Sequence, residues 1–177
     1  MYGFLPPTNS THAVRIARGM TTGAPKMRSI KVREEEFRFS SRIQLSDPSK
    51  YLLYCLAFFK DLVDAYVEEY REGVRPNITV ALLCGEIGIV SASGEFFANH
   101  AIRLRERARL PQLFFFGYAN GYHQYFPTIE AISEGGYGAD PDVAPVEIGA
   151  GERMMDRALY HLYDLRSEGD KSIRPMR

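Results

Sequence analysis

Two short segments place acidic, phenolic and amide side chains directly after apolar runs of the chain. Glu95 follows Gly94 at the end of the run IGIVSAS, where the glycine lets the backbone turn sharply. The second segment, NGYHQY, begins at Asn120 after the run LFFFGYA and carries Tyr122 and Tyr125. Open α/β sheets bind ligands where strands end, so these side chains are candidates for a binding or catalytic site.

A third segment, EGGYG, places paired glycines before Tyr137. Such glycines allow a backbone to pass close to a bound group while the phenol projects from it. Each segment also has a purely structural explanation. An acid near a helix start is stabilised by about 0.3–1 kcal/mol through the helix dipole, tyrosines are frequent in cores and interfaces, and glycines are frequent in loops. No single segment therefore identifies a function.

The spacing of apolar residues predicts the elements that carry these segments. Residues 31–45 alternate apolar and charged side chains, which predicts one half-buried strand or two short ones. An Asp-Pro pair at 47–48 is typical of a helix start, and apolar residues at three- and four-residue steps predict one long helix over 48–70. The run 78–90 is interrupted by Gly85 and predicts two buried strands joined by a tight turn.

The second half of the chain continues this alternation of strands and helices. The whole pattern predicts an α/β or α+β fold in which amphipathic helices flank a mixed β-sheet. The alternative is an antiparallel sheet with both amphipathic helices on one face. The expected elements are a helix over 95–110, an aromatic strand over 112–119, helical turns over 128–134, a short strand over 143–148 and a helix over 152–166.

We expect one α/β domain over residues 31–170, forming part of a larger parent domain. Residues 1–30 mix Pro and Gly with Ser and Thr and have no sustained period, which predicts an irregular N-terminal arm. Residues 171–177 are expected to form a polar tail.

The composition fits a folded protein and excludes several functions. Hydrophobic residues make up 45% and charged residues 25% of the 177 residues. The formal net charge of +0 gives no general attraction to nucleic acid, so we expect no such partner. No apolar run is long enough to span a bilayer and the first residues do not resemble a signal peptide, so the chain is expected to be soluble, in an unknown compartment.

The common sequence fingerprints of serine hydrolases, zinc proteases and nucleotide-binding proteins are absent from the sequence. The four histidines are scattered without the spacing of metal ligands, and His123 on its own is expected at the surface. Cys55 and Cys84 lie in apolar stretches and are expected to be buried thiols.

Taken in order, the segments resemble the C-terminal part of the large domain of the neutral and alkaline ceramidases and their bacterial relatives. The similar stretches are GEFFANHAIRLRER, FFFGYANGYHQYFPTIEAISEGGYGAD and GAGE, and the resemblance covers residues 78–166, about half the chain. In that family a strand ends in a Gly-Glu pair, the next ends in an N-x-Y-x-x-Y-x-x-T segment, and a further Tyr follows. Family members are zinc-dependent amidases that cleave the N-acyl bond of ceramide.

The resemblance implies a role for each of five residues. Glu95 and Tyr125 match the family's metal-binding Glu and Tyr, with Tyr122 as the second choice for that Tyr. Tyr137 matches an active-site Tyr near the metal or the scissile carbonyl. Asn120 and Tyr122 match the same strand-end segment and are expected to shape it and to contact substrate. A carboxylate and a phenol can complete a Zn²⁺ shell, and such an ion would activate a water and polarise the amide carbonyl.

No residue here matches the family's two histidine ligands or its active-site Ser. Two protein ligands are too few for a tight zinc site, which ordinarily has at least three. We therefore expect zinc in the complete family site but weak or no zinc binding by this chain alone, and no family turnover. The chain is then a fragment or derived relative of a zinc-dependent amidase acting on ceramide-like, amide-containing lipids.

The alternative function is a non-catalytic interaction or self-assembly module that uses the aromatic loop 118–126. Sheet edges and faces left uncovered in such a chain would drive formation of a homo-oligomer.

Overall fold

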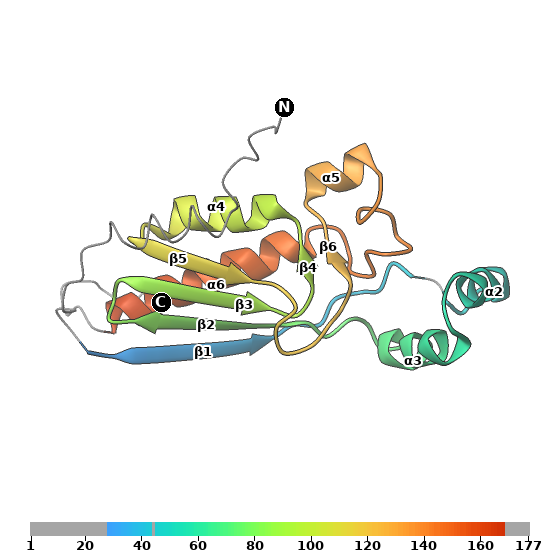
Figure 1. Cartoon of the computed structure of the whole chain (residues 1–177), viewed down its shortest axis with the longest axis horizontal. Coiled ribbons are helices and arrows are strands. Elements are labelled where there is room, and N and C mark those ends of the chain that lie inside the picture. The colour runs from blue at the N-terminus through green and yellow to red at the C-terminus, as the bar shows by residue number, and fades with distance from the viewer. Residues whose placement is uncertain (1–27, 44, 169–177) are drawn as a thin grey trace, which may run out of the picture.

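The main β-sheet of the protein has four strands, in the order β1-β2-β3-β5 (Figure 1). The computed structural model describes residues 28–43 and 45–168, so the expected tail and almost all of the expected N-terminal arm lie outside the described residues. β1 pairs antiparallel with β2, β2 antiparallel with β3, and β3 parallel with β5, which confirms the predicted mixed sheet. The strands are β1 (Ile30–Glu36), β2 (Asn77–Leu83), β3 (Ile87–Ala92) and β5 (Gln112–Phe116).

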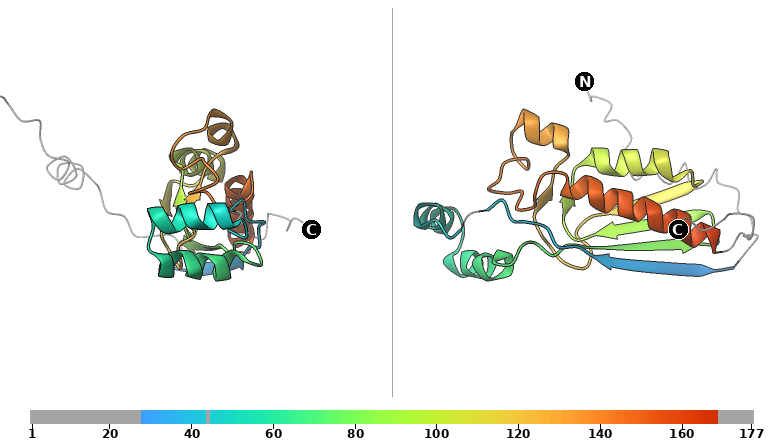
Figure 2. Two further views of the ribbon diagram at one scale, coloured as in Figure 1. Left: turned by 90° about the vertical axis from the view of Figure 1, so that its right-hand side faces the viewer. Right: turned by 180° about the vertical axis from the view of Figure 1, so that it is seen from behind.

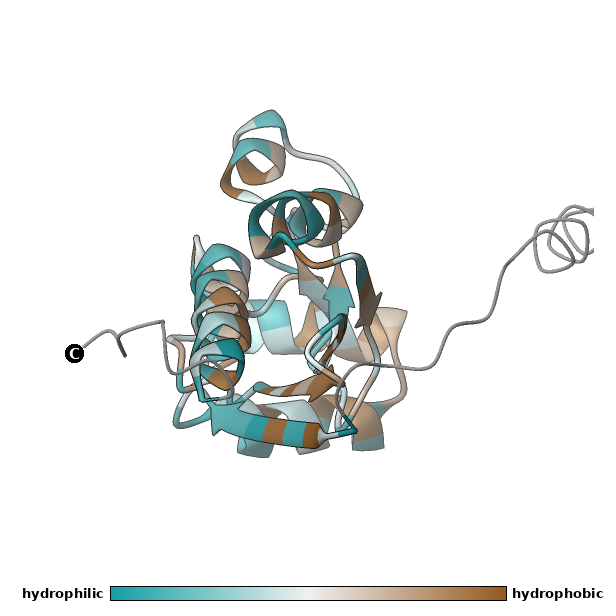
Figure 3. Ribbon diagram, turned by 90° about the vertical axis from the view of Figure 1, so that its left-hand side faces the viewer, coloured by the Kyte–Doolittle hydropathy of each residue, from teal (hydrophilic) through white to brown (hydrophobic). Residues whose placement is uncertain are grey.

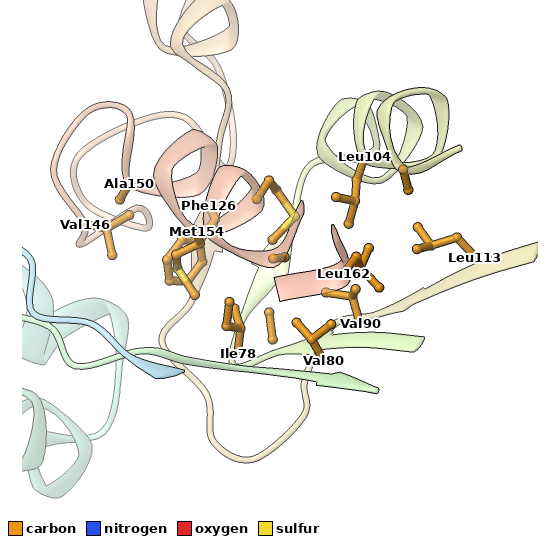
Figure 4. Close-up of a cluster of buried hydrophobic side chains, with 14 of the residues drawn as sticks. Ile78, Val80, Val90, Leu104, Leu113, Phe126, Val146, Ala150, Met154 and Leu162 are labelled. Carbon is orange, nitrogen blue, oxygen red and sulfur yellow. The ribbon is translucent and has the colours of Figure 1, made fainter. Parts of the chain in front are cut away.

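Two helices, α4 (Ala98–Ala108) and α6 (Ala150–Ser167), cover one face of this sheet. Seen along the strands in Figure 3, both lie on the same side, and α6 crosses β2 while α4 packs on α6 and β5. Alternate residues of the strands point toward the helices, and Figure 4 shows their side chains filling the layer between. Burying these side chains supplies the main favourable free energy of folding. Core members include Ile78, Val80, Val90, Leu104, Leu113, Met154 and Leu162.

The predicted single helix over residues 48–70 is wrong: the segment forms two helices, α2 (Pro48–Ala57) and α3 (Lys60–Tyr70). The two phenylalanines between them have extended backbone, so the chain reverses direction there. Figures 1 and 2 show the resulting hairpin at one end of the body, beyond the ends of the strands. Folding back lets Tyr54 of α2 and Val63 of α3 share a small core, whereas one straight helix would leave both apolar faces in water.

Two other predicted strands differ from the prediction: one is absent and the other ends early. Residues 143–148 form no strand, because Pro145 lacks the N–H that a β-ladder needs, and Val146 makes only an isolated bridge to Ser41. The predicted strand over 31–45 ends at the last residue of β1 and continues as extended chain with isolated bridges.

The remaining elements lie at the end of the sheet where β3 and β5 finish. β4 (Glu95–Phe96) and β6 (Tyr125–Phe126) form a second, two-stranded parallel sheet. α5 (Ile129–Glu134) follows, and the Thr128 side chain caps it by accepting a hydrogen bond from a backbone N–H of its first turn. The predicted helical turns over 128–134 are thereby confirmed.

The described part of the chain bears on two smaller predictions. None of its helices combines the length and the hydropathy that crossing a membrane requires. Cys55 and Cys84 are free thiols that are half-buried, because each has one side open to solvent, rather than fully buried as predicted.

Replacing Leu104 by Ala should destabilise the fold by about 2–5 kcal/mol, because the side chain is 2% exposed and its removal leaves a cavity between α4 and the sheet. Ile102 lies on the same helix and is 48% exposed, so Ile102→Ala is the matched control and should change the free energy of unfolding by no more than about 0.5 kcal/mol. Denaturant unfolding measures both. Equal effects of the two substitutions would contradict the assigned packing of α4.

Candidate functional site

Glu95 and Tyr125 are direct partners in the small parallel sheet. Their backbones are joined across β4 and β6, where the Glu95 N–H donates to the Gln124 carbonyl at 2.8 Å. The next pair in register, Phe96 and Phe126, stacks ring on ring with centroids 4.4 Å apart, and Phe126 is completely buried. This aromatic pair fixes the two strands to the core, so the side chains of the preceding pair are held at one place.

Gly94 is required for this arrangement because the backbone passes too close to the Phe126 ring for any side chain. A Cβ atom at position 94 would lie 2.4 Å from the Phe126 Cε2 atom and 2.9 Å from the Gln124 carbonyl oxygen. The glycine therefore allows the chain leaving β3 to reach the strand that carries Glu95. Glu95 itself lies in a strand and not in the first turn of α4, so the helix-dipole explanation for an acid at this position does not apply.

The Glu95 carboxylate is surrounded by phenol hydroxyls. The Tyr122 hydroxyl donates to Glu95 Oε1 at 2.5 Å, and the nearby Tyr118 and Tyr125 hydroxyls also act to lower the pKa of this carboxyl. The Tyr118 and Tyr122 rings stack with centroids 5.8 Å apart. Tyr118 was not among the residues predicted from the sequence, although it lies in the same aromatic loop.

Tyr137 reaches the cluster through Tyr125. Their rings meet edge to face with centroids 5.4 Å apart, and their hydroxyls are hydrogen-bonded. Tyr137 is 79% exposed and follows two glycines with positive φ, whose added side chains would meet nothing within 4 Å. The glycines therefore serve the turn, and Tyr137 forms the solvent-facing side of the cluster.

The pKa values follow from this geometry. Partial burial acts to raise the pKa of the Glu95 carboxyl, but the three phenol donors outweigh burial and hold that pKa below its usual value. In return, Tyr137 and Glu95 raise the pKa of Tyr125, and burial together with Glu95 raises that of Tyr122. At neutral pH the site is one carboxylate anion that accepts hydrogen bonds from neutral phenols.

Asn120 lies apart from the carboxylate cluster. Its side-chain amide donates to Thr79 Oγ1 at 3.0 Å, and its carbonyl accepts from the Asn77 amide at 3.0 Å. Its φ is +61°, a conformation that asparagine tolerates better than most residues. These contacts attach the aromatic loop to the end of β2, which is a positioning role.

The prediction that His123 lies at the surface is wrong. The His123 side chain is 12% exposed and its Nδ1 atom lies 2.9 Å from a carboxylate oxygen of Glu69 on α3. Burial nevertheless lowers the pKa of the His123 imidazole. Gln124 next to it is also buried. The contact with Glu69 places the loop against α3, and no sequence pattern indicated this.

Glu95 and Tyr125 are paired in register, so their side chains lie on one face of the small sheet. A carboxylate and a phenol oxygen are groups that could hold Zn²⁺. Within the described ranges, no group of three or more His, Cys, Asp and Glu side chains is placed to hold a metal ion. The residues fit two positions of the shell, and a tight site takes at least three protein ligands.

Comparison with known proteins gives a likeness at the level of the fold. No protein-family model and no curated protein sequence matches the chain. The neutral ceramidase of Pseudomonas aeruginosa is similar in structure, with a TM-score of 0.55 and 13% identity over 79% of this chain and 29% of that chain. A ceramidase complexed with C2 gives a TM-score of 0.47 and 18% identity over 52% of this chain and 15% of that chain.

The fold is thus ceramidase-like α/β, which confirms the fold part of the resemblance seen in the sequence. The chain spans less than a third of the length of either solved structure, with 29% and 15% covered. Identities of 13% and 18% establish no shared activity.

Tyr122→Phe should raise the pKa of Glu95, because the substitution removes a hydrogen-bond donor that stabilises the carboxylate. Carboxyl NMR titration measures this pKa, and Tyr160→Phe on α6 is the control that should leave it unchanged.

The folded-state pKa of Glu95 lies below its unfolded value, so the Glu95 carboxylate stabilises the fold at pH values above the ordinary carboxyl pKa of about 4.3. That stabilisation is lost as pH falls through the lowered pKa, and in Tyr122→Phe it should be smaller and its loss complete at a higher pH. An unchanged Glu95 pKa in Tyr122→Phe would show that the hydrogen bond is not formed in solution.

Proposed function

We propose that this chain is a piece or a derived relative of a ceramidase-like, zinc-dependent amidase, and that Glu95 and Tyr125 are two ligands of its metal site. One observation carries the proposal: Glu95 and Tyr125 are register-paired in the β4–β6 sheet, so a carboxylate and a phenol stand side by side on one face. The fold similarity to the Pseudomonas aeruginosa neutral ceramidase supports it. The substrate class is an N-acyl amide of a ceramide-like lipid.

The proposed chemistry assigns a task to each residue of the cluster. A zinc ion at this point would polarise an amide carbonyl and lower the pKa of a bound water. Tyr122 orients the Glu95 carboxylate through its 2.5 Å hydrogen bond. With a cation bound, Tyr125 would release its hydroxyl proton to solvent, and its phenolate together with the Glu95 carboxylate would hold the cation. Tyr137, on the solvent side, supplies a hydroxyl that can donate to the substrate carbonyl.

Asn120 and Tyr122 are proposed to line the substrate path. Tyr122 is 44% exposed, so its ring can contact a substrate while its hydroxyl is engaged with Glu95. Asn120 acts by holding the loop against Thr79. Because two protein ligands are available, the chain alone is proposed to bind zinc weakly and to be inactive until the remaining ligands are supplied.

The second candidate function is a non-catalytic interaction module that uses the aromatic loop 118–126. The observation that favours it is exposure: Tyr118 and Tyr122 of this loop are 66% and 44% exposed. Exposed tyrosines are enriched in protein interfaces. The two functions differ in what Glu95 does, because only the metal site needs its carboxylate.

Calorimetric zinc titration of the full chain should give weak binding that Glu95→Gln and Tyr125→Phe each reduce by at least about tenfold, because each removes one of two ligands. Tyrosinate absorbance should rise on zinc addition in the wild type and not in Tyr125→Phe, since zinc binding displaces the phenol proton. Tyr160→Phe is the control and should behave as the wild type. Equal zinc affinity in all four proteins, or no zinc binding in any, would refute Glu95 and Tyr125 as ligands.

The chain alone, with zinc added, should not hydrolyse a short-chain N-acyl sphingosine, because the ligand set is incomplete. Release of the free amine measures this directly. Zinc-dependent turnover that Glu95→Gln abolishes would show instead that the chain holds a complete site.

A further inference from the structure

The face of the main sheet opposite α4 and α6 carries an aligned set of apolar side chains. Residues that lie directly opposite one another on paired strands share a face. One such row runs across all four strands through Val32, Ala81, Ile89 and Phe114. In the part of the chain that the structure describes, helices pack only on the other face, so this row meets solvent.

The exposure of this face is large for side chains of this type. Phe116 adds a second ring on the same strand, stacked on Phe114 with centroids 6.4 Å apart. Apolar side chains presented together on a rigid, hydrogen-bonded sheet are a feature of interaction sites. The most exposed members are Ile30 at 75%, Phe116 at 52%, Val32 and Phe114 at 46% and Ile87 at 37%. We call this surface the open face, defined by these five residues with Ala81, Leu83 and Ile89.

We propose that the open face is the interface of a homodimer, in which a second copy of this chain packs sheet on sheet. The area is sufficient. Four strands about 4.8 Å apart and on average about six residues of about 3.3 Å each, with about 5 Å of side chain beyond every edge, give about 24 by 30 Å. That is on the order of the 800 Å² per partner that a stable interface buries. Two sheets packed in this way lie about 10 Å apart and are mutually inclined by about 30°.

The charge distribution favours a second copy. The chain has a formal net charge of +0, so two copies do not repel each other. Glu34 shares a cross-strand row with Thr79 and Phe116, and Glu36 pairs with Asn77 at the end of the sheet beyond that row. A two-fold axis along the Val32 row packs this apolar row on its own copy and sends the two Glu36 ends to opposite sides. The same acidic end disfavours an anionic membrane surface as the occupant.

This geometry also leaves the candidate site accessible. The aromatic loop is attached to the polar end of the open face, where Asn120 contacts Asn77 and Thr79. The two-fold arrangement places that end away from the axis, so the Glu95 cluster of each copy faces solvent. The dimer therefore does not depend on whether the site binds zinc.

Sedimentation velocity of the full chain should show a species of 40.2 kDa, twice the chain mass of 20.1 kDa. Phe114→Lys puts a charge among the apolar side chains of the open face, on the edge strand β5, and should weaken dimerisation at least tenfold. Val32→Lys places a charge on the same face from β1 and should also weaken dimerisation, so the test does not depend on one variant. Far-UV circular dichroism checks that both variants are folded. Leu56→Lys on α2 is the matched control, because Leu56 is 78% exposed and apolar but lies on another surface.

Three outcomes would overturn the proposal. They are a wild-type monomer at all concentrations up to about 100 µM, a dimer that survives both sheet variants, or a dimer lost only in Leu56→Lys, which would assign association to the α2 surface. Zinc is absent throughout these runs, so failure here is distinguishable from failure of the proposed metal site.

Discussion

The stacking of Phe96 on Phe126 is the interaction on which the candidate site depends. These rings link the last residues of two very short strands to the core beneath α6, and a strand of two residues has too few hydrogen bonds to hold itself. Because the rings are fixed, the residues one step earlier in register are fixed as well. The 2.4 Å approach of position 94 to the same ring explains why a glycine is needed there. The arrangement of the candidate site is therefore a consequence of core packing.

Two opposing effects, partial burial and hydrogen bonding from phenols, set the pKa of the Glu95 carboxyl. Glu95 is partly buried, which opposes its charge, and the cluster compensates with phenol donors where most surface acids would use lysine or arginine. Phenols stabilise the anion and remain neutral, so the site keeps a full negative charge available to a cation. An arginine in the same place would neutralise that charge and exclude a metal. This choice of partners is what distinguishes the Glu95 site from the salt bridges elsewhere on the surface, such as that between Arg107 and Asp156.

Local sequence patterns predicted most of the elements, and tertiary packing decided the rest. The strands of the β2–β3 hairpin, α4, β5 and α6 follow directly from periodicity, because each buries one continuous apolar face. The break between α2 and α3 could not be predicted, since no Gly or Pro marks it and only the shared core of Tyr54 and Val63 explains it. The buried position of His123 likewise depends on Glu69 of a distant helix. The grouping of Glu95 with Tyr122 required the strand register that only the fold provides.

Both faces of the main sheet carry apolar side chains, although the described helices cover only one of them. β3 must present Val90 to the helices and Ile89 to the open face, because alternate residues of a strand point in opposite directions. A strand that is apolar on both faces is typical of a sheet covered on both sides. The described elements cover one side only. A second layer over the open face would cover the apolar side chains that β3 presents there. The strand ends that carry Glu95 would remain exposed to solvent.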